Sequence, residues 1–157
     1  MKARTRSLLT VSAMALALGG ASASAETCEG QAGDGAVKLT VDTTSLRAAQ
    51  GEVAVTVYPD DSKRFLAPHG KLLRARVPAT QPVTRTCFWL PPGAYAVAVY
   101  HDQNGDHAFN RNALGEPVEG FGFSNDAPTK FNVPKFEAVR FHLPAGGKTI
   151  SLHMRYP

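Results

Sequence analysis

Oxygen-bearing side chains occupy alternate positions at the start of one loop, at Asp102, Asn104 and Asp106. In a tight loop every second side chain turns inward, so these three side chains can converge on one cation. The main-chain carbonyl of Ala108 and the side chain of Asn110 then stand where calcium loops place further oxygen ligands. Calcium is the natural candidate, because it tolerates irregular oxygen coordination and is abundant outside the cytosol.

Two positions of this loop differ from those of a tight calcium loop. His107 stands where such a loop has Gly for its sharp turn, and Ala113 stands where a bidentate Glu belongs. Glu116 or Glu119 could reach back to supply the missing carboxylate. We therefore predict a weak calcium site with these side-chain ligands: Asp102, Asn104, Asp106, Asn110 and Glu116. The alternative is a solvated Asn-Gly turn with acidic neighbours and no bound metal.

Catalytic signatures are absent from the sequence. It contains no Gly-x-Ser-x-Gly, no His-Glu-x-x-His and no phosphate-binding loop. Asp102 with Glu116 or Glu119 could form a carboxylate pair for hydrolysis beside a histidine. A transition-metal site could also use three histidines in or near loops: His69, His101 and His107. Neither arrangement has a recognised spacing, so the sequence favours a non-enzymatic binding or accessory module, with a structural envelope component as a further alternative.

The first 25 residues have the features of a secretory signal peptide. Three basic residues come first, an apolar run follows over residues 8–18, and Ala23 and Ala25 form a small-residue cleavage site. The apolar run is shorter than the roughly 20 residues that span a bilayer, and no lipoprotein box precedes Cys28. We expect residues 1–25 to be removed, leaving a periplasmic or secreted mature chain with no membrane span.

The charge balance of the mature chain is close to neutral. The full sequence has 17 Lys and Arg against 13 Asp and Glu, and removal of the leader leaves 14 against 13. This balance gives no support to a nucleic-acid-binding surface.

The only two cysteines, Cys28 and Cys87, favour one disulfide bond in an oxidising compartment. A bridge across a loop of this size is worth about 4 kcal/mol in the chain-entropy description.

Short stretches of alternating apolar and polar residues predict an all-β fold with a single domain. About seven strands are expected, over residues 37–42, 51–58, 72–77, 83–90, 95–101, 139–143 and 150–155. Residues 26–35 are Gly-rich and expected to be flexible, residues 43–50 could hold a helical turn, and Pro144 to Gly147 is expected to close a hairpin. We predict an antiparallel, immunoglobulin-like β-sandwich over residues 36–157, with a small closed barrel as the alternative.

Four phenylalanines follow the acidic loop and are expected to cover one end of the sandwich: Phe121, Phe123, Phe131 and Phe136. Exposed aromatic side chains on loops are typical of binding surfaces, so a ligand groove could lie there. The expected partner is therefore an unknown protein or small ligand at the loops of residues 101–126.

Three blocks of sequence in series resemble the bacterial extracytoplasmic family catalogued as domain of unknown function number 2141. They are residues 90–106, 115–125 and 134–141, within a match over roughly residues 36–155. The Pro-Gly-x-Tyr strand alone is also similar to transthyretin-like and carboxypeptidase-regulatory sandwich modules. The resemblance implies a small secreted or periplasmic sandwich with no established activity. The family loop has Gly after its third ligand and Asp where this chain has Asn110, so His107 and Asn110 imply a weaker cation site here.

Overall fold

The computed structural model describes residues 27–129 and 133–157 of the chain. The predicted signal peptide, residues 1–25, and Phe131 lie outside these described residues. The described residues form eight strands: β1 (Val37–Thr44), β2 (Glu52–Pro59), β3 (Leu73–Pro78), β4 (Val83–Leu90), β5 (Gly93–Asp102), β6 (Phe121–Phe123), β7 (Phe141–Leu143) and β8 (Lys148–His153). Two short helical segments accompany them: η1 (Ser124–Asp126) and α1 (Phe136–Val139).

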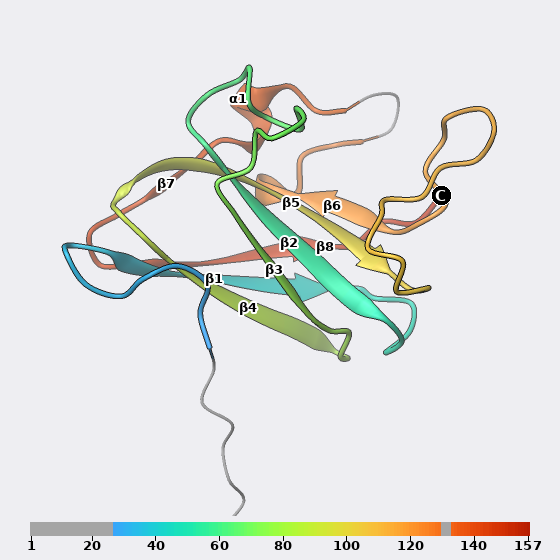
Figure 1. The fold of residues 1–157 in the computed structure, drawn as a ribbon, viewed down its shortest axis with the longest axis horizontal. Helices are drawn as coiled ribbons and strands as arrows, with labels where there is room; N and C mark the ends of the chain where they lie inside the picture. Colours follow the sequence, from blue (N-terminus) through green and yellow to red (C-terminus); the bar gives the residue numbers. More distant parts are fainter. Residues whose placement is uncertain (1–26, 130–132) are drawn as a thin grey trace, which may run out of the picture.

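The strands form two sheets that face each other (Figure 1). One sheet has the order β4-β1-β8, and the other has the order β3-β2-β5-β6, with β7 also paired to β5. Every strand pair is antiparallel except β1 with β8, which is parallel. The predicted all-β sandwich is therefore confirmed.

The inward-facing side chains of both sheets form one apolar core. Its fully or almost fully buried members include Leu39, Val41, Val53, Val55, Val57, Phe88, Leu90, Val97 and Val99. Full burial of a side chain of this kind contributes roughly 1.5–3 kcal/mol. The core thus lies between the two sheets.

Three details of the predicted chain path are wrong. The strand β6 was missed, because a three-residue strand with a central Gly122 has no readable alternation. The turn at Pro144–Gly147 does form, with the Gly147 N–H donating to the Pro144 carbonyl at 3.0 Å. It closes no hairpin, because β7 pairs with β5 while β8 pairs with β1 in the other sheet. Residues 45–51 contain no helical turn.

The aromatic residues after the acidic loop cover a sheet face rather than an end of the sandwich. Phe123 is buried with Tyr58 and Ala96 on the outer side of the five-stranded sheet, and Phe121 and Phe136 pack against them. The small side chain of Ala96 allows α1 to approach, because Val139 of that helix belongs to the same cluster. This face consequently carries a second packed layer, built by the segments that follow β5 together with Phe65 of the loop between β2 and β3.

The predicted disulfide between Cys28 and Cys87 is present, with 4.6 Å between the Cα atoms. The next residue, Glu29, pairs with the edge of β4: its N–H donates to the Cys87 carbonyl and its carbonyl accepts from the Trp89 N–H. The start of the described chain is therefore fixed to the three-stranded sheet. Within the described ranges, the structure contains no helix of the length and apolarity needed to cross a membrane.

Candidate functional site

Outward-facing side chains of the five-stranded sheet lie in cross-strand rows, since paired residues of neighbouring strands share a face. One row places Glu52 of β2 directly opposite Asp102, the last residue of β5. The next row holds Arg76 of β3, Ala54 of β2 and Tyr100 of β5. Carboxylates facing each other across strands repel. The Nη1 atom of Arg76 lies 3.1 Å from Asp102 Oδ2 and 3.9 Å from Glu52 Oε2, so it compensates both charges.

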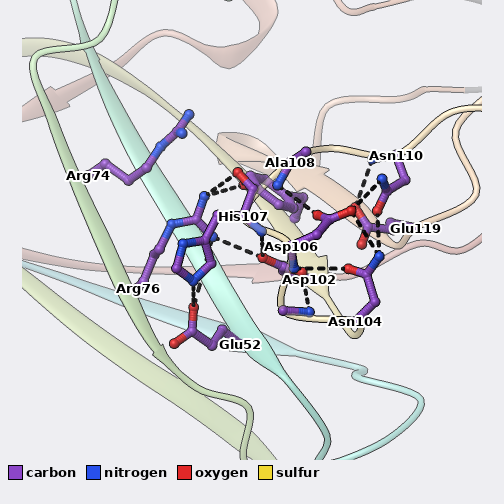
Figure 2. Close-up of polar contacts among 12 residues, drawn as sticks. Glu52, Arg74, Arg76, Asp102, Asn104, Asp106, His107, Ala108, Asn110 and Glu119 are labelled. Carbon is purple, nitrogen blue, oxygen red and sulfur yellow. Dashed lines mark hydrogen bonds and ion pairs between the residues drawn. The ribbon is translucent and has the colours of Figure 1, made fainter.

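The carboxylate of Asp102 is fully buried, and both of its oxygens are occupied within the protein (Figure 2). Oδ1 accepts a hydrogen bond from the Gly105 N–H at 2.8 Å, and Oδ2 accepts from the His107 N–H at 2.9 Å. Oδ2 also accepts from Arg76 Nη1 at 3.1 Å. A buried charge is costly unless it is paired and hydrogen-bonded. Asp102 therefore fastens the loop that follows it to the sheet.

Arg76 also binds the main chain of the loop directly, at His107. Its Nη2 donates to the His107 carbonyl at 2.8 Å and to the Tyr100 hydroxyl at 2.5 Å. The guanidinium carbon lies 5.4 Å from the centre of the Tyr100 ring, within the range of a cation–π contact. One arginine on β3 thus holds a side chain at the end of β5 and the main chain of the loop at once.

Two residues with positive φ lie at this end of the sheet, His107 in the loop after β5 and Gly51 in the loop before β2. His107 has a φ of 63°, in the left-handed region of backbone conformation. A histidine adopts this conformation less readily than a glycine. Gly51 has a φ of 71°, and a Cβ atom there would collide with the carbonyl oxygen of Asp102. The loop before β2 therefore packs directly on the backbone at the end of β5.

A second polar group is centred on Asp106, further along the same loop (Figure 2). Its Oδ2 accepts from Asn110 Nδ2 at 2.8 Å and from Asn104 Nδ2 at 2.9 Å, and its Oδ1 accepts from the Ala108 N–H at 2.8 Å. These hydrogen bonds, led by the one from Asn110, hold the pKa of the Asp106 carboxyl below its ordinary value. Asp106 is thus ionised throughout the neutral range.

Glu119 is the buried carboxylate beside this group. Its side chain comes from the segment just before β6, and its Oε2 accepts from the Asn110 N–H at 3.0 Å. Burial is the main cause that raises the pKa of Glu119, and the negative charges of Asp102 and Asp106 raise it further. The hydrogen bond from the Asn110 N–H acts in the opposite direction. Glu119 therefore joins the end of the loop between β5 and β6 to the middle of that loop at Asn110.

The structure brings together only part of the predicted calcium-ligand set. Asn104, Asp106 and Asn110 lie in mutual contact, whereas the carboxylate of Asp102 faces Arg76. Glu116 is in a separate turn, where its Oε2 accepts from Asn112 Nδ2 at 2.8 Å. The carboxylate near the loop is Glu119, which the sequence offered as an alternative to Glu116. Calcium binding remains a prediction, and a bound ion would require the amides of Asn104 and Asn110 to turn their oxygens inward.

A different group of side chains has the compactness of a metal site. Ligand atoms of Glu52, Asp102 and His107 lie within 4.8 Å of one another, and His107 Nε2 is 3.3 Å from Glu52 Oε2. Arg76 already supplies a positive charge to both carboxylates. A metal ion would be repelled by that guanidinium, so the geometry favours an ion-pair network.

The buried His101 lies on the opposite side of β5 from Asp102. Its Nδ1 is 2.6 Å from the Tyr156 hydroxyl and its Nε2 is 2.7 Å from the Gln50 carbonyl. Both ring nitrogens are used to connect β5 with the C-terminal segment and the loop before β2. This histidine has a structural role.

A cleft of about 640 Å³ opens on the outer face of the five-stranded sheet. Its floor is the cross-strand row that follows Arg76, which places Arg74, Thr56, Ala98 and Phe123 side by side on β3, β2, β5 and β6. The small side chains of Thr56 and Ala98 leave space at the centre of this row. Aromatic side chains of neighbouring rows and of the loop line the sides: Tyr58, Tyr100, Phe109 and Phe121.

The sequence analysis missed Arg74 and Arg76, although the sequence contains a signal for them. Both arginines alternate with Ala75 and Val77 in a predicted strand, so two cations had to lie on its polar face. Their partners were not predictable, because the register that sets Arg76 beside Tyr100 appears only in the folded sheet.

We predict that Arg76→Met lowers the free energy of unfolding by about 3 kcal/mol, since it leaves the buried carboxylate of Asp102 without a countercharge. The matched control is Arg85→Gln, which removes the partner of Asp42 in an exposed pair on the other sheet. That change should cost less than about 1 kcal/mol. Urea unfolding of the three proteins measures both values. Equal losses for the two variants would contradict the role given to Arg76.

The calcium prediction is tested by thermal unfolding in EDTA, in millimolar calcium and in millimolar magnesium. We expect a Kd for calcium on the order of 10⁻⁴–10⁻³ M. At a calcium concentration ten times the Kd, binding would stabilise the folded protein by about 1.4 kcal/mol. We expect a rise in Tm of a few degrees with calcium, little change with magnesium, and no calcium effect in Asp106→Asn. Identical Tm values of the unaltered protein in EDTA and calcium would show that the loop binds no calcium.

Comparison with known proteins places the chain in a family. A family described as an uncharacterized protein conserved in bacteria, DUF2141, matches residues 41–151. No curated protein and no solved structure matches significantly. The matched range contains parts of both sheets together with the whole Asp102 loop. The similarity to transthyretin-like modules stays a prediction. The chain belongs to the bacterial family of uncharacterized proteins DUF2141.

Proposed function

We propose that this protein is a non-enzymatic, extracytoplasmic binding module, and that the cleft on the five-stranded sheet takes a small ligand. The observation that carries the proposal is the open row over Thr56 and Ala98, which neighbouring aromatic side chains surround without filling. Ligand sites in proteins are typically clefts of roughly 300–1,000 Å³ with apolar walls and a few polar groups. The cleft has this size and this lining.

The position of the cleft supports binding by a preformed surface. Its floor consists of strand residues, whose places are fixed by the sheet. One wall is the loop after β5, where Phe109 contacts both Tyr100 and Phe121, with ring centres 5.5 Å and 5.7 Å apart. Asp102 and Arg76 hold the beginning of that loop on the sheet, at the main chain of His107. The position of Phe109, two residues later, is therefore restricted. A rigid site loses little entropy when a ligand binds.

The carboxylates argue for binding rather than hydrolysis. Asp102 and Glu119 are buried, and both accept hydrogen bonds from main-chain N–H groups. Among the described residues that line the cleft, Glu116 is the only acid, so no second carboxylate faces it across a bound substrate. Hydrolysis by a carboxylate pair needs two such groups on opposite sides of the reacting bond.

An oxidising compartment is supported by the disulfide between Cys28 and Cys87. Bonds of this kind persist mainly in secreted and periplasmic proteins. Together with the predicted signal peptide, this favours a location outside the cytoplasm.

We predict that the neutral fluorophore N-phenyl naphthylamine binds saturably to the native protein, and that Ala98→Leu weakens the binding at least tenfold. The leucine side chain would fill the floor of the cleft, because residue 98 lies at its centre. Fluorescence titration measures the affinity, and urea unfolding confirms that the variant is folded.

The control is Thr149→Leu, which adds similar apolar bulk at an exposed position of β8 in the other sheet. It should leave the affinity unchanged. Equal affinities for all three proteins would place the binding elsewhere, and the absence of saturable binding would favour a purely structural protein of the cell envelope.

A further inference from the structure

Arg74 is a cation of the cleft that, like Arg111, has no carboxylate partner in the part of the chain that the structure describes. Its Nε donates to Thr56 Oγ1 at 2.8 Å, and its guanidinium carbon lies 5.9 Å from the centre of the Tyr100 ring. The neighbouring Arg76, by contrast, is paired with Asp102 at 3.1 Å. Figure 2 shows the two arginines one after the other along β3, with only Arg76 joined to the acidic loop.

The described residues that line the cleft carry a net positive charge. Arg74 lies on the sheet side and Arg111 on the loop side, where its Nη1 donates to the Gly115 carbonyl at 2.8 Å. The one acid of the described lining, Glu116, is hydrogen-bonded to Asn112. Two guanidinium groups thus stand against one carboxylate. Aromatic rings can attract cations. The positive charge of the two guanidinium groups outweighs that attraction, so the cleft would repel a cationic ligand and attract an anionic one.

The order of side chains along the row gives the ligand a direction. Arg74 stands at one end, Ala98 lies in the middle and Phe123 stands at the other end. Neighbouring strands are about 4.8 Å apart, so β3 and β6 are separated by about 14 Å. That span accommodates a flat body of one or two rings over Ala98, with an acidic group at the Arg74 end.

We propose that the cleft binds small planar aromatic carboxylates, with the carboxylate paired to Arg74 and the ring lying over Ala98. The inference rests on the proposed function and adds the chemical class of the ligand. Arginine suits this role, because its guanidinium fork matches the two oxygens of a carboxylate. The rings of Tyr100 and Phe123 flank the ligand body and contribute edge-to-face contacts.

The experiment compares two probes of nearly equal shape, naphthoate and the neutral naphthamide, by calorimetric titration of the full chain. We expect naphthoate to bind at least ten times more tightly than naphthamide. Arg74→Gln should remove this difference by weakening naphthoate alone. Arg85→Gln, a cation removed from the other sheet, should preserve it.

The outcomes distinguish failure of the carboxylate preference from failure of the proposed binding function. Equal affinities of the unaltered protein for naphthoate and naphthamide would overturn the anion preference and leave the cleft as a binding site for neutral ligands. An unchanged preference in Arg74→Gln would overturn the assignment to Arg74. Failure of both probes and of N-phenyl naphthylamine to bind would overturn the proposed function itself. The comparison of the two probes on the unaltered protein needs no variant, so it stands even where Arg74→Gln folds poorly.

Discussion

The buried contact between Asp102 and Arg76 is the interaction on which the rest of the candidate site depends. Asp102 is the last residue of β5, so its side chain belongs to the outer face of the sheet and not to the interior of the loop. A carboxylate without solvent is stable there only because one guanidinium and two main-chain N–H groups share it. These donors lie on β3 and in the loop, so satisfying one charge fixes the relative position of both elements.

The cleft follows from this arrangement. Once the start of the loop is held against β3, Phe109 reaches the rings of Tyr100 and Phe121 and forms a wall beside the sheet. The floor stays open because Thr56 and Ala98 are small, whereas the adjacent Ala96 is covered by α1 and Phe123. The outward face of β5 therefore has two parts. Ala96 is covered by packed side chains, whereas Ala98 lies at the floor of the cleft.

The architecture was largely predictable from the sequence, because alternation of apolar residues reports which face of a strand is buried. The valines of β2 and β5 and the disulfide partners Cys28 and Cys87 show this. The site was less predictable. The spacing of Asp102, Asn104 and Asp106 predicted a shared cation, but Asp102 is held by Arg76, which is 26 residues away along the chain. Contacts of that kind depend on the combined register of β3, β2 and β5, and no single turn sets it, because β4 lies between β3 and β5 in the chain and belongs to the other sheet.

Amide hydrogen exchange at Gly105 and His107 tests the central claim most directly, because their N–H groups donate to Asp102. In the unaltered protein both amides should exchange slowly, although they lie in a surface loop. In Arg76→Met we expect exchange at both amides to become at least tenfold faster, while core amides of β2 keep their protection under native conditions. Equal protection of Gly105 and His107 in the two proteins would contradict the claim that the pair of Asp102 and Arg76 holds the loop on the sheet.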